Sequence, residues 1–248
     1  VKIIIGPVFN ENLIYLDELK NIIFLSLTNK TDNRHKNIIS AGINATSQLK
    51  TIKKFINLNE IKKTIFLTPD VDYKNEIKKA ILNSKIKIIK NYFYDSKPTK
   101  LTKQIEEITN YKRRKQNLED EVVRLEKSED ANKEKLIEKL RTKDTLGKVN
   151  FDSVIIADFD ESLKSVTTSL LYTDISPKKK YFITFNQWFD ESLLKETSSQ
   201  PIYFPSINKK NYEDFSIDYF SKFSEYPNQL SFLSFDLVGL TYYLILQN

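Results

Sequence analysis

The side chains best suited to holding a ligand lie directly after short apolar runs that are typical of strands. In an open parallel sheet, ligand contacts come from the loops at the carboxyl ends of the strands. Amides, hydroxyls and carboxylates in such loops orient a polar molecule, and an aromatic ring covers its apolar part. The candidate ligand-binding residues are Asn10, Thr28, Asn29, Asp70, Tyr73, Asp158, Asn186 and Trp188.

Each candidate also has a structural interpretation, which stays open at this point. Asn10 and Asp158 precede predicted helices, so either side chain could cap a first turn. Thr28 and Asn29 are residue types that form turns. The aromatic candidates have packing as their alternative: Tyr73 could pack across a hinge, and Trp188 could pack in a core.

Catalysis has little support in the sequence. The chain has no cysteine, four glycines and a single histidine, His35, which lies in the polar run NKTDNRHKN. No nucleophile motif, phosphate-binding loop or metal-ligand spacing accompanies the carboxylate pair Asp158 and Asp160. We therefore predict a protein that is not an enzyme and that binds no cofactor and no metal ion.

The net charge of +6 at first suggests a nucleic-acid partner. The cations are spread along the chain, however, and no zinc-finger, basic-zipper or RNA-binding signature accompanies them. We therefore predict no nucleic-acid binding. We also expect no membrane-spanning helix, because no apolar run approaches the roughly 18–20 residues that a span needs. No signal peptide precedes Val1, so we expect a processed or truncated piece.

Short apolar runs rich in β-branched residues alternate with amphipathic stretches along most of the chain. We predict strands at 2–8, 21–27, 37–43, 63–70, 85–95, 152–159, 179–185 and 201–207. We predict helices at 45–59, 73–85, from Pro98 onward, and at 161–172, 188–196, 211–226 and 229–246. This alternation predicts an α/β fold with parallel sheets flanked by helices.

The order of the elements further predicts two lobes. The strands before Thr46 are too few to bury a sheet alone, whereas a fresh series of strands begins at Lys63. The apolar helix 229–246 is the obvious candidate to return and complete the first group. We predict a partial first lobe at 1–59, a second lobe at 60–207, a return to the first lobe at 208–248, and a ligand cleft between the lobes.

The charged stretch 111–144 begins with KRRK and falls inside the predicted second lobe, within a helical insert at about 101–146. From Lys112 to Asp144 it carries eleven cations and nine anions, so its charge is nearly balanced. Apolar residues recur at three- and four-residue spacing before and after the polar turn SEDANKE. We predict that a helix continues through the cations and that a second helix returns as a hairpin, with a single long helix as the alternative. A docking surface for a protein partner is the best functional interpretation.

The order of the motifs resembles that of type 1 periplasmic binding proteins, the family of the leucine-binding proteins of ABC transporters. IIIGPVFN resembles the family's first strand and turn, and PNQLSFLSFDLVGLTYYLI resembles its last helix. Between them, the matching segments are FLSLTN, ISAGINATSQLKTIKKF, IFLTPDVDYKNEIKKAI, FDSVIIADFDESLKSVTTSLLYTDI and YFITFNQWFD. Among subfamilies, the similarity is greatest to the penicillin-binding-protein activators.

The sequence departs from the family in two places. The family begins with another strand–helix–strand–helix section before its first matching strand, so the resemblance implies a first lobe truncated at its N-terminus. The amino-acid receptors also carry a serine and threonine cluster after the Gly-Pro turn. Here that turn continues as FNEN, residues 9–12, which argues against an α-amino-acid ligand.

The resemblance implies a periplasmic receptor that binds a small polar, amino-acid-like solute and delivers it to an ABC permease. The alternative that it implies is an interaction module that regulates a peptidoglycan synthase and has no transport role. Either protein would be periplasmic, with a membrane tether in a missing N-terminal segment. A basic cytosolic α/β regulator is a third hypothesis.

Overall fold

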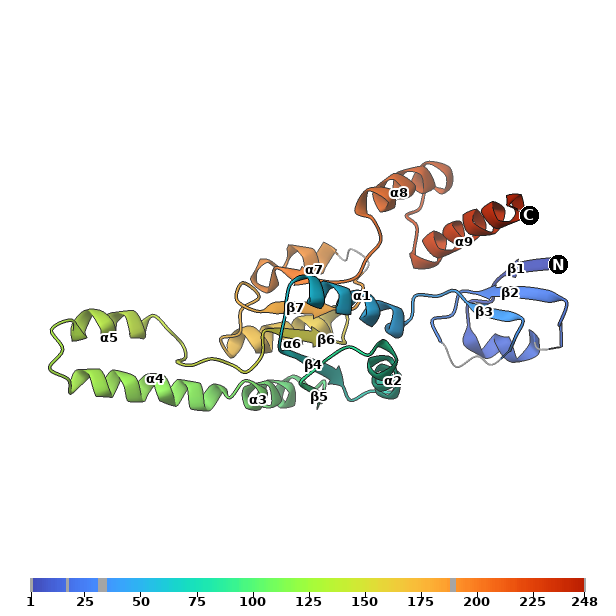
Figure 1. Cartoon of the computed structure of the whole chain (residues 1–248). Coiled ribbons are helices and arrows are strands. Elements are labelled where there is room, and N and C mark those ends of the chain that lie inside the picture. Colours follow the sequence, from blue (N-terminus) through green and yellow to red (C-terminus); the bar gives the residue numbers. More distant parts are fainter. Residues whose placement is uncertain (1, 17, 31–34, 188–190, 248) are drawn as a thin grey trace. The chain divides into compact units, whose positions relative to one another are not determined.

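The computed structural model of the chain describes residues 2–16, 18–30, 35–187 and 191–247. The chain divides into two compact units. Unit 1 contains residues 1–49 and 206–248, and unit 2 contains residues 50–205. Each unit has its own parallel β-sheet (Figure 1). The lobe boundaries predicted from the sequence, after residues 59 and 207, stay predictions.

The sheet of unit 1 has three parallel strands in sequence order. They are β1 (Lys2–Ile5), β2 (Ile22–Ser26) and β3 (Ile38–Ser40). A 3₁₀ helix, η1 (Asn10–Leu16), follows β1. One of its side chains, Leu13, is buried against Phe24 of β2 and Ile38 of β3. This small cluster holds η1 against the sheet.

Two helices at the end of the chain complete unit 1. They are α8 (Lys209–Phe223) and α9 (Gln229–Leu246), and each begins at an asparagine that accepts backbone N–H groups of the first turn. Aromatic rings join the two helices, since Phe232 of α9 lies 4.7 Å from Tyr212 and 4.4 Å from Phe215, between ring centroids. Within the same unit, α9 packs against β1.

The expectation that no helix reaches membrane-spanning length is wrong for α9. Among the described residues, this 18-residue helix is the one that is long and apolar enough to cross a membrane, with a mean hydropathy of 1.4. The apolar character comes from an almost unbroken run of large side chains in which Asp236 is the one charged residue. Length and composition by themselves assign no membrane span.

Unit 2 contains a five-stranded parallel sheet, as the series of strands beginning at Lys63 predicts. Across the sheet, the order is β5 (Lys90–Tyr94), β4 (Thr64–Pro69), β6 (Ser153–Ile156), β7 (Tyr181–Thr184) and β8 (Ile202–Tyr203). Every residue of β4 and β6 is buried. Strands that are buried along their whole length are typical of a parallel sheet that is covered on both faces.

Helices pack on the two faces of this sheet. On one face, side chains of α3 (Pro98–Ile108) and α6 (Asp160–Tyr172) join alternate strand residues in one core. On the other face, Phe55 of α1 (Ala45–Leu58) contacts the rings of Tyr181 and Tyr203, at 5.9 and 5.0 Å between ring centroids. Unit 2 also contains α2 (Lys74–Ser84), α7 (Glu191–Lys195) and the 3₁₀ helix η2 (Thr197–Ser199).

The charged stretch forms a helical hairpin, as predicted. Its helices are α4 (Tyr111–Glu126) and α5 (Lys133–Arg141), which lie side by side and extend away from the sheet of unit 2 (Figure 1). Leu125 and Leu140 are the apolar side chains buried between them. We call residues 111–144 the hairpin.

A buried arginine fixes the base of the hairpin to unit 2. The guanidinium of Arg114, whose residue is 5% exposed, donates to the Thr109 carbonyl at 3.1 Å, to the Thr145 hydroxyl at 3.1 Å and to the Thr173 carbonyl. The Thr145 hydroxyl in turn donates to the Asp174 carboxylate at 2.6 Å. These bonds join the hairpin to the C-terminal ends of α3 and α6.

Several predicted elements differ from the structure: the strands predicted at 2–8, 37–43 and 201–207 are shorter, being 2–5, 38–40 and 202–203, and the helix after Pro98 ends early. The helix after Pro98 does not continue through the cations, because α3 ends at Ile108 and Asn110 has a left-handed φ of 51° before α4 begins. Asparagine tolerates that conformation better than most residues. The strand predicted at 85–95 is shorter, since β5 pairs with β4 only from Lys90 onward.

Candidate functional site

The carboxyl edge of the unit 2 sheet brings together three of the predicted site residues. Tyr73 follows β4, Asp158 follows β6 and Asn186 follows β7, and these strands are neighbours in the parallel sheet. Two residues that the sequence did not point to join them there: Tyr94, the last residue of β5, and Gln187. We call Tyr73, Tyr94, Asp158 and Gln187 the edge cluster.

Asp158 is the centre of the edge cluster. It is 6% exposed, and its two carboxylate oxygens accept different donors, the Tyr94 hydroxyl at 2.6 Å and the Phe159 backbone N–H at 3.0 Å. Burial raises the pKa of the Asp158 carboxyl, and the nearby Asp160 adds to the rise. The two hydrogen bonds oppose that rise because they stabilise the ionised form.

Both tyrosines lie near this carboxylate. The Tyr73 hydroxyl donates to the Ala157 carbonyl at 3.3 Å. Burial, together with the charge of Asp158, raises the pKa of Tyr73 to about 12. The same two causes raise the pKa of Tyr94 well above its ordinary value. Both phenols therefore stay protonated at neutral pH and act as hydrogen-bond donors, which makes neither a general base.

The side chain of Gln187 links β6 to β7 at this edge. Its amide nitrogen donates to the Asp158 carbonyl at 3.2 Å and to the Phe185 carbonyl at 3.1 Å. Asn186 beside it is 5% exposed. The Phe185 ring stacks on that of Phe159, with centroids 6.4 Å apart. The edge cluster is therefore bonded mainly to itself and to neighbouring backbone.

Asp70 lies at the same edge of the sheet but outside the edge cluster. Its backbone N–H donates to the Tyr94 carbonyl at 2.8 Å, whereas its carboxylate is exposed and pairs with Lys74 on the next turn. An exposed pair of this kind contributes little to stability. The carboxylate of Asp70 is thus open to solvent.

The candidates in unit 1 divide into a buried one and two exposed ones. Thr28 is 5% exposed, and its hydroxyl accepts the Lys30 backbone N–H at 3.2 Å, which is the turn that the structural interpretation predicted. Asn10 begins η1 and is exposed, and Asn29 is exposed in the turn. Trp188 lies outside the described residues.

Helix capping, the alternative for Asp158, is wrong in its ordinary form. The N-cap of α6 is Phe159, and no side chain caps it; Asp158 instead accepts the N–H of the residue next to it. Its carboxylate serves the bond to Tyr94 across the sheet. The residue is therefore part of an interstrand network and not of a helix cap.

The polar side chains of the edge cluster already have hydrogen-bond partners within unit 2. Among the described residues, no group of three or more His, Asp or Glu side chains could hold a metal ion. Within the same ranges, no buried side-chain nitrogen or oxygen lacks a hydrogen-bond partner. A site that binds a buried polar ligand would have buried polar atoms without a hydrogen-bond partner when the ligand is absent.

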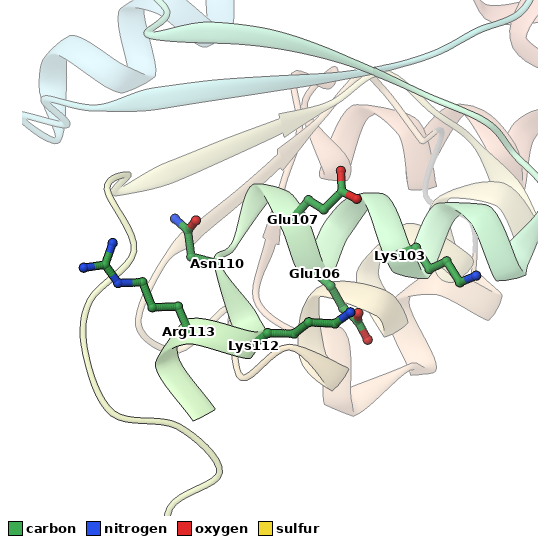
Figure 2. A pocket seen from close by; sticks show the side chains of 6 residues that line it. All are labelled: Lys103, Glu106, Glu107, Asn110, Lys112 and Arg113. Atoms are coloured by element: carbon green, nitrogen blue, oxygen red, sulfur yellow. The ribbon is translucent and has the colours of Figure 1, made fainter. Parts of the chain in front are cut away.

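Two surface pockets lie around the insert in unit 2. One, of about 680 Å³, is at the junction of α3 and α4 (Figure 2). Its lining has cations, carboxylates and one amide: Lys103, Glu106, Glu107, Asn110, Lys112 and Arg113. Every one of these residues except Glu106 is exposed, so a ligand there would keep most of its water. The other pocket, of about 350 Å³, lies between α4 and α5.

No protein-family model and no curated protein matches the sequence, but solved structures do. An ABC transporter substrate-binding protein from Desulfitobacterium hafniense superposes with a TM-score of 0.56 at 12% identity, over 95% of this chain and 62% of that one. A branched-chain amino acid ABC transporter periplasmic ligand-binding protein from Burkholderia xenovorans gives 0.53 at 11%, over 92% and 55%.

The C-domain of LpoA from Haemophilus influenzae, a regulator of PBP1A, has the same fold. It superposes with a TM-score of 0.54 at 11% identity, over 88% of this chain and 61% of that one. The chain therefore spans about three fifths of the length of these structures. Their common architecture, parallel sheets flanked by helices, is the one described above. The chain has the α/β fold of the type 1 periplasmic binding proteins.

Proposed function

We propose that this chain is a non-enzymatic binding protein of the bacterial envelope that acts by contacting a peptidoglycan synthase. The observation that carries the proposal is the hairpin, which extends from unit 2 and is nevertheless fixed at its base by the buried Arg114. Helices that a fold does not need for its core, held in a set orientation, are suited to presenting a surface. The shared fold with a regulator of PBP1A supports this choice of partner.

The edge cluster supports the same proposal because it argues against the binding of a solute at the sheet edge. Asp158, Tyr73 and Gln187 direct their polar atoms to Tyr94 and to backbone groups of unit 2. To bind a solute, they would have to exchange those bonds for ligand bonds, with little net gain. We therefore interpret the edge cluster as a structural network that ties β4, β5, β6 and β7 together.

The test is direct binding to a purified synthase of the PBP1A type from the same genome. We expect reversible association with the whole chain, measured by biolayer interferometry, and a change in the rate at which the synthase polymerises glycan strands. A chain heated to unfold it serves as the control. A synthase that shows neither association nor a change in rate would refute the proposal.

The second candidate function is a solute receptor of an ABC transporter, passing an amino-acid-like solute to a permease. Its support is the set of exposed polar side chains at strand ends: Asn10, Asn29 and Asp70. Under this alternative, a panel of amino acids, short peptides and aromatic acids would contain a compound that raises the melting temperature. The rise should disappear in an Asn10→Ala/Asp70→Ala variant. We expect no compound in the panel to raise it.

Both candidate functions imply a location outside the cytoplasm. The proteins that share the fold are named as a substrate-binding protein, a periplasmic ligand-binding protein and a regulator of PBP1A. We propose a periplasmic location and, for the chain, two lobes that correspond to units 1 and 2. Fractionation of cells that express the full-length protein, followed by immunoblotting, tests the location. Recovery with the cytoplasmic fraction would contradict it.

A further inference from the structure

The pocket between α4 and α5 has an apolar floor, which sets it apart from the pocket at the α3–α4 junction. Leu125 and Leu140, 6% and 9% exposed, form that floor, and Leu136 is 38% exposed beside them. A volume of about 350 Å³ is enough for one or two large side chains. The hairpin therefore carries a small apolar cleft on a surface that is otherwise charged.

The charged side chains around this cleft differ in whether they have hydrogen-bond or ion-pair partners within the chain. Glu121 accepts two hydrogen bonds from Arg124, at 2.7 and 2.6 Å, and Asp130 accepts the Asn132 backbone N–H at 2.8 Å. Among the described residues, the ammonium groups of Lys139 and Lys143 have no carboxylate within salt-bridge distance. The lining has three cations and two carboxylates, so the net charge that the cleft offers to a partner is weakly positive and is carried by Lys139 and Lys143.

We propose that this cleft is a docking site for a protein segment in which a large apolar side chain is flanked by acidic residues. The apolar side chain would fill the space over Leu125, Leu136 and Leu140, and the carboxylates would pair with Lys139 and Lys143. This inference rests on the proposed function, and the segment belongs to the peptidoglycan synthase.

The chemistry of the hairpin favours a protein partner over a polyanion or a lipid surface. Between Lys112 and Asp144, eleven cations are balanced by nine anions, so the hairpin has no continuous positive face of the kind that binds phosphates. An apolar anchor with paired charges around it is the usual composition of a protein docking site. The fixed base of the hairpin lowers the cost of docking, because the surface is already ordered.

Charge reversal at the rim tests the proposal in the whole chain. We expect the Lys139→Glu/Lys143→Glu variant to bind the purified synthase at least about tenfold more weakly than the unmodified chain at low salt. The matched control is Lys127→Glu/Lys135→Glu, which makes the same change in net charge on exposed hairpin residues that do not line the cleft. We expect this control to bind within about twofold of the unmodified chain. Circular dichroism checks that both variants fold.

A cross-link identifies the segment that occupies the cleft. The chain has no cysteine, so Leu136→Cys provides a single thiol for a photo-reactive label. We expect the label to attach to an acidic segment of the synthase, and a label at Lys127→Cys not to attach there. If the unmodified chain does not bind the synthase at all, the proposed function itself is refuted. Unchanged binding by Lys139→Glu/Lys143→Glu would overturn this inference alone, and so would cross-linking to a segment without acidic residues.

Discussion

At the scale of single residues, the buried carboxylate of Asp158 gives the fold a particular dependence on pH. Its pKa is raised in the folded chain, chiefly by burial, so the folded state holds this proton more tightly than the unfolded state does. The stability that the group contributes is therefore present below its ordinary pKa and is lost as pH rises through the folded pKa.

The variant Asp158→Asn removes this titration and isolates its effect. We expect the free energy of unfolding of the unmodified chain, minus that of the variant, to fall as pH rises from about 4. Urea denaturation at several pH values between 4 and 8 measures this difference. A difference that stays constant or grows with pH would show that the carboxyl does not titrate as described.

Two glycines make a second residue-scale prediction, because they have opposite surroundings. A Cβ at Gly42 would lie 2.3 Å from the Thr28 carbonyl oxygen and 2.6 Å from the Leu27 carbonyl oxygen, both in the backbone. A Cβ at Gly239, inside α9, would meet nothing within 4 Å. We expect Gly42→Ala to cost about 2–4 kcal/mol of unfolding free energy, since the backbone must move.

The comparison variant is Gly239→Ala. We expect it to be neutral or to stabilise by about 0.5–1 kcal/mol, because alanine favours the helix. Thermal denaturation of both variants measures the contrast. Equal effects of the two substitutions would contradict the close approach of Gly42 to the loop after β2.

The residues of the edge cluster show which parts of a site can be predicted from the sequence. Asp158 and Tyr73 were predicted because each follows an apolar run, which is a local pattern. Tyr94 was missed because its bond to Asp158 joins two strands, β5 and β6, that are not hydrogen-bonded to each other and have β4 between them. That order of strands is determined by the packing of the whole unit, so it cannot be predicted from a local sequence pattern.

At the scale of elements, the side chain of Arg114 contributes three hydrogen bonds at the base of the hairpin. Replacing Arg114 by alanine removes three hydrogen bonds and leaves the carbonyls of Thr109 and Thr173 without this donor. We expect a loss of about 2–4 kcal/mol of unfolding free energy. We also expect faster hydrogen exchange at the base of the hairpin, which mass spectrometry measures.

The neighbouring Arg113 provides the control, because it is exposed. Arg113→Ala should stay within about 0.5 kcal/mol of the unmodified chain. Arg114→Lys should lose most of what Arg114→Ala loses, since an ammonium group does not reproduce the planar fork of the guanidinium. Full stability of Arg114→Lys would show that the charge matters and the three directed bonds do not.

The alternation of strands and helices can be predicted from the sequence, whereas the break between α3 and α4 cannot. Apolar residues keep helical spacing through 105–125, so periodicity predicts one helix there. The break comes from Asn110 in the left-handed conformation, which allows Arg114 to reach the end of α6. A long-range bond therefore overrides the local pattern.

At the scale of the molecule, the cores of the two units differ in size. A single buried cluster in unit 2 draws on four strands and three helices, whereas the cluster around Leu13 in unit 1 contains three buried residues. We expect a fragment of residues 44–205 to fold alone and to unfold cooperatively in urea, because it retains α1 and the whole five-stranded sheet. A broad transition without a native baseline would contradict this expectation. The full chain, followed by the same probes, is the control.

The helix α6 lies between two of the polar networks of unit 2, one at each of its ends. Its N-terminal end adjoins Asp158 and the carboxyl edge of the sheet, and its C-terminal end leads into Thr173 and Asp174, which hold the base of the hairpin. The thirteen residues between them span about 20 Å as a rigid rod. One helix therefore borders both the carboxyl edge of the sheet and the base of the hairpin, so the positions of these two networks relative to each other are set by the same element.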